Sequence, residues 1–255
     1  MGIVNVTPDS FSDGGQFLDA PRAIAYGLKL RDDGADFVDV GGESTRPGSQ
    51  PVPADEELRR VMPVVGALAR EGVAVSIDTM KAAVMLEAIR AGCAVVNDVN
   101  GFRGEGTIEA VARSKVGVVA MHMQGTPGTM QKEPRYADVV AEVTQFLLAR
   151  AHALEAAGVA RERIALDPGF GFGKTVEHNK ALFHSLPQLA AHGYPVLVGV
   201  SRKKMIGDFT GRPAAERAAG SVAAALLAVQ NGASMVRVHD VRETVDAINV
   251  WMELK

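Results

Sequence analysis

The chain contains the stretch Val75-Ser76-Ile77-Asp78, a short apolar run that ends in a polar residue. Similar runs recur along the sequence at an average interval of about 33 residues. They are Ile3-Val4-Asn5, Phe37-Val38-Asp39, Val95-Val96-Asn97-Asp98, Val118-Val119-Ala120-Met121-His122, Ile164-Ala165-Leu166-Asp167, Val196-Leu197-Val198-Gly199-Val200-Ser201 and Val236-Arg237-Val238-His239. Apolar runs of this length are typical of strands that are buried on both faces. A polar residue at the same end of each run predicts parallel strands whose ends open into one mouth.

Segments with helical patterns separate these runs. They cover residues 21–31, 54–70, 81–90, 107–115, 137–157, 177–192, 214–230 and 241–254. Most stop next to a glycine, which commonly ends a helix in the left-handed conformation. The alternation predicts an α/β protein, a (β/α)8 TIM barrel that forms a single domain over residues 1–255. The alternative is an open doubly wound sheet, which usually has fewer strands and carries a glycine-rich turn after its first strand.

Composition narrows the function classes. The formal net charge is −3, which gives no sign of a nucleic-acid or membrane surface. Cys93 is the single cysteine, so we expect no internal disulfide and a cytoplasmic location. The sequence has no run of 18 apolar residues and no signal-peptide pattern at its start. Because it begins directly at the first predicted strand, we expect the segment that usually closes the bottom of a barrel to be absent.

The residues at the predicted strand ends form a strongly polar set. The set comprises Asn5, Asp39, Asp78, Asn97, Asp98, His122, Asp167, Ser201 and His239, with Lys203 and Arg237 within two residues of such ends. Any one of them could cap a helix or anchor a loop, and this is the simpler interpretation of Asp39 and Asp98. As a set, acids and amides that converge in one mouth need a ligand or one another as partners.

Part of this set suits an aromatic heterocycle that is rich in N–H donors. Carboxylates such as Asp78 and Asp167 accept two parallel N–H bonds from a guanidine-like edge, and the Asn97 amide both donates and accepts. Lys203 could donate to a ring carbonyl and Met121 could contact a ring face, although simple barrel packing explains Met121 equally well. A purine-like or pterin-like ring therefore fits this pocket better than a sugar.

The basic members of the set indicate an anion site. Arg237 and His239 alternate on one strand, so both point to the same side. Arginine binds phosphate with two parallel bonds, and many barrels bind phosphate near the last strand. Asn5 on the neighbouring first strand, together with Asp13, could supply oxygen ligands for Mg²⁺. Alternatively, His239-Asp240 could simply cap the last helix, but Arg237 would then be an unpaired charge in the mouth.

Three loops follow strand ends. Residues 7–20 combine Gly, Pro, Ser, Thr and Asp, and residues 43–53 combine Gly, Pro, Ser and Thr, compositions typical of mobile loops that close over ligands. The third, Asp167 to Lys174, resembles a phosphate-binding loop, but Pro168 stands where that motif requires a glycine. We therefore discount this third loop as a phosphate site.

Longer motifs carry a resemblance to a known family. Asn5-Val6-Thr7-Pro8-Asp9-Ser10-Phe11-Ser12-Asp13-Gly14-Gly15 and Asp39-Val40-Gly41-Gly42-Glu43-Ser44-Thr45-Arg46-Pro47-Gly48 resemble the first two signatures of the dihydropteroate synthases. Ser76–Thr79, Asn97–Val99, Asp167–Phe172, Gly199–Lys203 and Arg237–Asp240 resemble the remaining family segments in order. The resemblance extends over essentially the whole chain.

The resemblance implies a reaction. The family joins p-aminobenzoate to 6-hydroxymethyl-7,8-dihydropterin diphosphate and releases diphosphate, a step of folate synthesis that sulfonamide drugs inhibit. An SN1-like displacement is expected, with Asp78, Lys203 and Asp13 as catalytic residues. The resemblance also implies a homodimer formed through the later helices, for which Val222 to Val229 and Trp251 are candidate contacts.

The family also implies a division of the site residues. Pterin would be bound by Asp78, Asn97, Val99, Met121, Asp167, Phe172 and Lys203. Diphosphate would be bound by Asn5, Thr45, Arg237 and His239, with Mg²⁺ on Asn5 and Asp13. The p-aminobenzoate pocket would comprise Phe11, Thr45, Pro47, Phe172, Ser201 and Lys203.

Other functions stay open from the sequence. A pterin-dependent methyltransferase would have a similar ring pocket but would need neither the Asp9–Gly15 loop nor the anion site at Arg237 and His239. A catalytically silent relative would show a broken motif, and none is visible in the loops or at the strand ends. A purely structural barrel would not keep so polar a mouth.

Overall fold

Parallel strands form the centre of a computed structural model that describes residues 1–7, 20–46 and 48–255. Six pair in sequence order: β1 (Gly2–Asn5), β2 (Val38–Gly41), β3 (Val75–Asp78), β4 (Val95–Asp98), β5 (Gly117–Met121) and β6 (Ile164–Asp167). The short strands β7 (Leu197–Val198) and β8 (Met235–Val236) pair with each other. Single bridges from Leu166 to Val196 and from Gly2 to Val238 join both groups into a circle. The predicted (β/α)8 barrel is confirmed.

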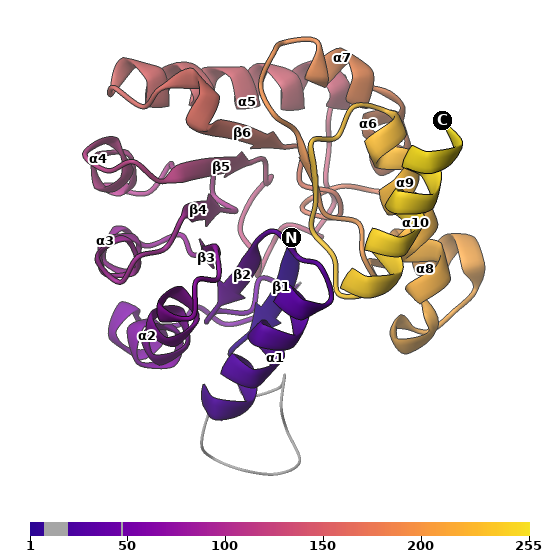
Figure 1. Ribbon diagram of the computed structural model, residues 1–255. Coiled ribbons are helices and arrows are strands. Elements are labelled where there is room, and N and C mark those ends of the chain that lie inside the picture. The colour runs from indigo at the N-terminus through magenta and orange to yellow at the C-terminus, as the bar shows by residue number, and fades with distance from the viewer. Residues whose placement is uncertain (8–19, 47) are drawn as a thin grey trace.

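Helices surround the strands. In Figure 1, α2 to α5 lie along one side of the strands and α8 to α10 along the other. The α-helices are α1 (Ala20–Asp32), α2 (Ala54–Arg70), α3 (Ala82–Arg90), α4 (Thr107–Ala112), α5 (Val139–Ala156), α6 (Val176–His184), α7 (Leu186–Ala190), α8 (Lys204–Thr210), α9 (Ala218–Gln230) and α10 (Val241–Leu254). Short 3₁₀ turns cover Arg161–Arg163 and Ala214–Glu216. Within the described ranges, no helix is both long and apolar enough to cross a membrane.

Two helix predictions need correction, and one helix was missed. The segment predicted at 177–192 is two helices that meet at Ser185, because Pro187 lies in the first turn of α7 and supplies no amide hydrogen to continue α6. The segment predicted at 214–230 begins as a 3₁₀ turn and becomes α-helical only at Ala218. The helix α8 was not predicted, since its seven residues are too few to show a clear period.

Strand alternation places two layers of side chains inside the barrel. Val95, Val119, Ala165 and Leu197 form part of one buried apolar cluster. Two positions further along β4 and β6 stand Asn97 and Asp167, which therefore point into the same interior. The apolar layer closes the lower part of the barrel, and the layer above it is polar and faces the mouth.

Helices α1 and α2 pack closely because α1 has a glycine at the contact. A Cβ atom added at Gly27 would lie 2.7 Å from a methyl carbon of Leu68, a fully buried side chain of α2. Gly66, also in α2, has free space, since a Cβ added there would meet nothing nearer than the Arg70 guanidinium at 3.9 Å.

We expect Gly27→Ala to destabilise the protein by about 1–3 kcal/mol, because the added methyl group overpacks the contact with Leu68. Gly66→Ala is the matched control and should be neutral or stabilising by about 0.5–1 kcal/mol, because it removes a helical glycine without a clash. Urea unfolding of the three proteins measures both effects. Equal stability of Gly27→Ala and the wild type would contradict this packing.

Candidate functional site

The described strand-end residues lie around one mouth of the barrel. Asn5, Asp78, Asn97, Met121 and Asp167 are the last or nearly the last residues of β1, β3, β4, β5 and β6. Ser201 and Lys203 follow β7, and Arg237 and His239 follow β8. Thr45 lies half-buried in the loop after β2. The predicted site residues Phe11, Asp13 and Pro47 lie outside the described residues.

A buried ion-pair network joins three strands at the base of this mouth. Arg237 Nε donates to Asp39 Oδ2 at 2.6 Å, and Arg237 Nη2 donates to Asp78 Oδ2 at 2.9 Å. Asn97 Nδ2 donates to the same Asp39 oxygen at 3.3 Å. Arg237 would therefore not be an unpaired charge even if His239-Asp240 only capped the last helix, contrary to what we inferred from the sequence. The interpretation of Asp39 as a helix cap or loop anchor is also wrong, because its carboxylate is fully buried inside the barrel.

Burial controls the protonation of this network. Removal from water raises the pKa of Asp78 to about 7, against the opposing attraction of Arg237. Burial alone would lower the pKa of Arg237, but Asp39 and Asp78 outweigh it and raise that pKa. Within the described part of the chain, Asp39 Oδ1, Ser76 Oγ and Asn97 Oδ1 are buried without a hydrogen-bond partner. Such atoms are poised to bind a polar ligand or water.

The opposite side of the mouth combines a lysine with an apolar wall. Lys203 Nζ lies 4.5 Å from the centre of the Phe172 ring and donates to the Phe170 carbonyl. Burial lowers the pKa of Lys203 to about 8, although Asp167 opposes the shift. Burial also raises the pKa of Asp167, whose Oδ1 accepts from Gly169 N at 2.7 Å.

The wall itself is an apolar cluster rich in methionine. It consists of Val99, Met121, Met123 and Met130, with Met80 and Phe172 packed against it. Val99, Met121 and Phe172 were predicted as ring contacts, whereas Met80, Met123 and Met130 were missed. Met123 could have been found, because it continues the inward alternation of Met121. Methionine side chains adapt their shape, which suits a wall against a flat ring.

Lys174 was also missed as a structural element of the site. Its buried Nζ lies 2.9 Å from His122 Nδ1 and donates to the carbonyls of Gly169 at 2.9 Å, Phe172 at 3.0 Å and His122 at 3.3 Å. Burial lowers the pKa of His122 to about 3, so its imidazole is neutral and Nδ1 can accept. Lys174 therefore holds the loop after β6 in shape, and its contacts direct it away from a phosphate-binding role.

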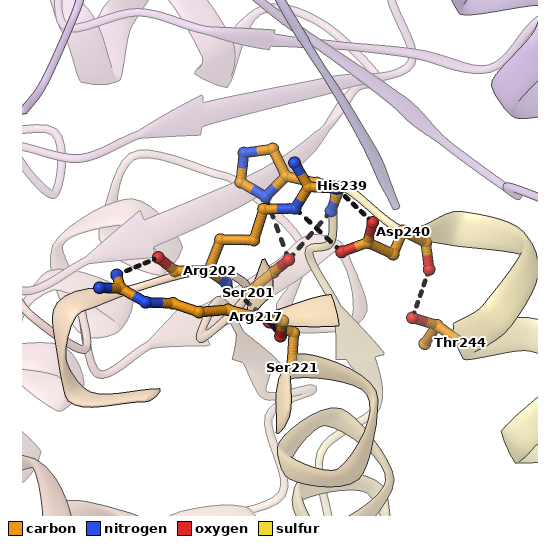
Figure 2. A network of polar contacts seen from close by, with 7 residues as sticks. All are labelled: Ser201, Arg202, Arg217, Ser221, His239, Asp240 and Thr244. Carbon is orange, nitrogen blue, oxygen red and sulfur yellow. Dashed lines mark hydrogen bonds and ion pairs between the residues drawn. The ribbon is translucent and has the colours of Figure 1, made fainter. Parts of the chain in front are cut away.

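A second network fixes the turn after β7 against the end of β8 (Figure 2). His239 N donates to Ser201 Oγ at 3.1 Å, and that oxygen lies 3.0 Å from His239 Nδ1. The His239 amide occupies one lone pair of Ser201 Oγ, so the Ser201 hydroxyl can donate its proton to His239 Nδ1. The proton of the neutral His239 ring is then on Nε2, which can donate to a ligand. Burial lowers the pKa of His239 to about 4, so the ring is neutral at pH 7.

The same network explains two neighbouring charges. Arg202 pairs with the Asp240 carboxylate through two nitrogens, and Arg217 Nη1 donates to the Arg202 carbonyl at 3.0 Å (Figure 2). The same Nη1 donates to the Lys203 carbonyl at 3.2 Å. The Asp240 side chain makes no capping hydrogen bond to α10. These contacts hold the turn that presents Ser201 and Lys203 to the mouth, with Arg202 in the left-handed region at φ 58°.

The loop after β2 is tied down at its base. Lys81 Nζ pairs with Glu43 and, at 2.5 Å, with the fully buried Glu57 of α2. Gly48 N donates to Pro127 O at 3.2 Å, so this loop also contacts the loop after β5. Together these segments border a cleft of about 460 Å³, lined among others by Glu43, Met80, Lys81 and Met123.

Metal binding can be examined only in part. No group of three or more His, Cys, Asp and Glu side chains suited to a metal occurs within the described ranges. Asn5 lies on an inward position at the end of β1, and its amide makes no hydrogen bond with a described residue. A single amide oxygen is a donor that Mg²⁺ accepts when substrate oxygens and water complete its coordination.

Comparisons with known proteins agree along the chain. A family model described as pterin binding enzyme matches residues 1–239. The dihydropteroate synthase of Neisseria meningitidis serogroup C is 52% identical, over 100% of this chain and 92% of that protein. The Xanthomonas albilineans dihydropteroate synthase with 4-aminobenzoic acid superposes with a TM-score of 0.93 at 52% identity, over 99% of this chain and 91% of the other. The Yersinia pestis dihydropteroate synthase in a sulfonamide drug complex superposes with a TM-score of 0.94 at 44% identity, over 99% of this chain and 92% of the other.

The raised pKa of Asp78 gives a prediction for stability. A carboxyl whose pKa rises from 3.8 to about 7 on folding costs stability increasingly as the pH rises through that window. Asp78→Asn removes this cost, while Arg237 keeps Asp39 as a partner. We expect the variant to melt at the same or a higher temperature than the wild type at pH 8, and its relative advantage to shrink towards pH 4. Calorimetry at pH 4, 6 and 8 measures this, and an advantage that grows as the pH falls would contradict it.

Proposed function

The chain belongs to the pterin-binding enzyme family and carries out the dihydropteroate synthase reaction of folate biosynthesis. We propose here which residues of the barrel mouth bind each part of the substrates in that reaction. The reaction joins p-aminobenzoate to the CH₂ carbon of 6-hydroxymethyl-7,8-dihydropterin diphosphate and releases diphosphate. The observation that carries the division is the contact of Arg237 with Asp78, which brings a cation suited to diphosphate beside a carboxylate suited to the pterin.

The pterin ring is assigned to the buried acids and the amide. Asp78, Asn97 and Asp167 line the interior at the ends of β3, β4 and β6. Asn97 Oδ1 is buried without a partner among the described residues, so it can accept an N–H bond from the ring. Lys203 donates from the opposite side, and Val99, Met121 and Phe172 contact a face of the ring. These partners match the donors and acceptors on the edge of a pterin.

Diphosphate is assigned to Arg237, His239, Thr45 and Asn5. Arg237 supplies positive charge, and the neutral His239 ring supplies an Nε2–H donor. Asn5, with Asp13, would hold a Mg²⁺ ion, which when bound would neutralise part of the charge that builds up on diphosphate. Arg237 and His239 perform the same electrostatic role from the protein side.

The p-aminobenzoate is assigned to the rim between two loops and the turn after β7. Ser201 and Lys203 supply polar groups after β7, and the Phe172 ring packs against Lys203. Thr45, in the loop after β2, is assigned to the same subsite. Phe11 and Pro47 are assigned to it from the sequence resemblance and lie outside the described residues. Sulfonamides, which the related Yersinia pestis protein binds, would compete at this place. The aromatic amine is neutral at pH 7, so it needs no strong base.

The displacement is SN1-like in this proposal. Diphosphate leaves from the CH₂ carbon with its bonding electron pair, and the carbon that remains is a cation conjugated with the pterin ring. Asp78 stabilises this cation as its carboxylate, and Arg237 beside it favours that ionised form. The amine nitrogen then forms the new bond and loses a proton. Exclusion of water protects the cation from hydrolysis.

We also propose that the chain works in the cytoplasm as a homodimer. Large apolar side chains are exposed on α9 and α10: Leu227, Val250, Met252 and Leu254. The two helices pack against each other and lie on one side of the barrel (Figure 1). Exposed apolar groups in such number favour a protein partner. Burial raises the pKa of the Cys93 thiol to about 12, so this thiol is unreactive. A single unreactive thiol agrees with a reducing compartment such as the cytoplasm.

Activity tests the proposal directly. Purified protein with pterin diphosphate, p-aminobenzoate and Mg²⁺ should release diphosphate only when p-aminobenzoate is present. Lys203→Ala should lower kcat/KM by about 100-fold or more, because it removes a charged donor from the pocket. Lys204→Ala is the matched control, since this exposed neighbour pairs with Asp208 at the protein surface. Equal activity of the two variants would contradict the assignment of Lys203.

Light scattering tests the dimer. We expect the wild type to show twice the chain mass of 26.9 kDa, and Val250→Glu to shift the equilibrium towards the monomer because it places a charge in the apolar patch. Leu86→Glu is the control, because Leu86 is an exposed apolar residue on α3, on the other side of the barrel (Figure 1). A wild-type protein that stays monomeric at high concentration would contradict the dimer.

A further inference from the structure

Asp39 occupies a position that no substrate role explains. It lies within β2, and neighbouring strands pair it with Ile3 on one side and Ser76 on the other. Its side chain is fully buried, with no exposed surface, so it lies below the mouth rather than in it. One of its oxygens, Oδ2, accepts from both Arg237 and Asn97.

The contact with Arg237 fixes the orientation of the guanidinium. Nε is held by Asp39 at 2.6 Å and Nη2 by Asp78 at 2.9 Å, so one edge of the planar group has two anchors. Two anchors on one edge prevent the group from rotating. Nη1 makes no hydrogen bond with a described residue and is left for a ligand. Without Asp39, Asp78 would be the remaining anchor.

The contact with Asn97 fixes an amide in the same way. A carboxylate oxygen only accepts hydrogen bonds, so the group that faces Asp39 must be the Asn97 NH₂. The Asn97 carbonyl oxygen is thereby committed as an acceptor, and it is buried without a partner in the described part of the chain. Asp39 therefore decides which half of the amide is offered to a ring.

We propose that Asp39 is a positioning residue, which holds the Arg237 guanidinium and the Asn97 amide in one rigid unit and so aligns the diphosphate and pterin parts of the site before substrate binds. The inference rests on the proposed function, because it takes its two subsites from there. Asp39 itself touches neither substrate. Misplacement of a group by about 1 Å can cost 100-fold in rate, so the effect of losing this unit is measurable.

The first experiment compares two substitutions at position 39. In Asp39→Asn the charge is lost, and in Asp39→Glu the charge is kept but moved outward by one methylene. We expect both to lower kcat/KM for pterin diphosphate by about 30-fold or more and to leave KM for p-aminobenzoate within about twofold of the wild type. Calorimetry with pterin diphosphate should show the same loss of affinity without turnover. A structural ion pair alone would tolerate Glu, so normal kinetics in a folded Asp39→Glu variant would overturn the proposal.

Asp98→Asn serves as the matched control. Asp98 is equally buried, but its carboxylate accepts from the backbone amides of Asn100 and Phe102 at 2.7 and 2.8 Å and anchors a loop. This variant should lower the melting temperature without changing KM for pterin diphosphate. An increase in that KM as large as in Asp39→Asn would show a general effect of buried charge and would overturn the proposal.

A double-mutant cycle separates action through Arg237 from an independent effect. In an Arg237→Met background, Asp39→Asn should cost clearly less in affinity for pterin diphosphate than it does in the wild type, because only the Asn97 amide is then left for Asp39 to orient. The same loss in both backgrounds would overturn the proposal. A wild-type protein that releases no diphosphate in the presence of p-aminobenzoate would overturn the proposed function, whereas an active wild type with unaffected Asp39 variants would overturn only the positioning role.

Discussion

Arg237 carries a charge inside a closed barrel, and the rest of the site depends on how that charge is paired. A largely buried guanidinium without partners would be costly, and the carboxylates of Asp39 and Asp78 lie close to it and balance its charge. The pairing brings β2, β3 and β8 together at one height in the barrel. It also leaves an acceptor facing the mouth, since Asn97 Oδ1 stays buried without a partner in the described part of the chain. A ligand with N–H donors can use this acceptor.

Two lysines and one arginine outside this network hold the loops around the mouth. Lys174 gathers the carbonyls of the loop after β6, Lys81 ties the loop after β2 to α2, and Arg217 holds the turn after β7. Lys174 and Arg217 donate to backbone carbonyls of loops, and Lys81 joins Glu43 of a loop to Glu57 of a helix. These contacts make the site rigid where the backbone alone would be mobile.

The electrostatic character of the mouth follows from burial. Lys203 and Asp78 have pKa values moved towards neutrality, and the rings of His122 and His239 are neutral at pH 7 because burial lowers the pKa of each. The site therefore offers neutral donors next to charges that are balanced by a near partner. This arrangement suits a reaction in which charge separates, because both the anion that leaves and the cation that remains meet fixed groups of opposite sign.

The sequence by itself determined the barrel, most helix limits and the set of residues at the mouth. The spacing of the apolar runs, the glycines that end helices and the polar residues at strand ends are local signals in the sequence. The limits of α2 and α10, for example, follow from such signals. Only the tertiary structure decided the partners. That Asp39 binds Arg237, 198 positions away, depends on closure of the barrel between β8 and β1, and no local pattern records it. Lys174 and Met130 were missed for the same reason: their roles come from neighbours that the fold brings near, not from the residues beside them in the chain.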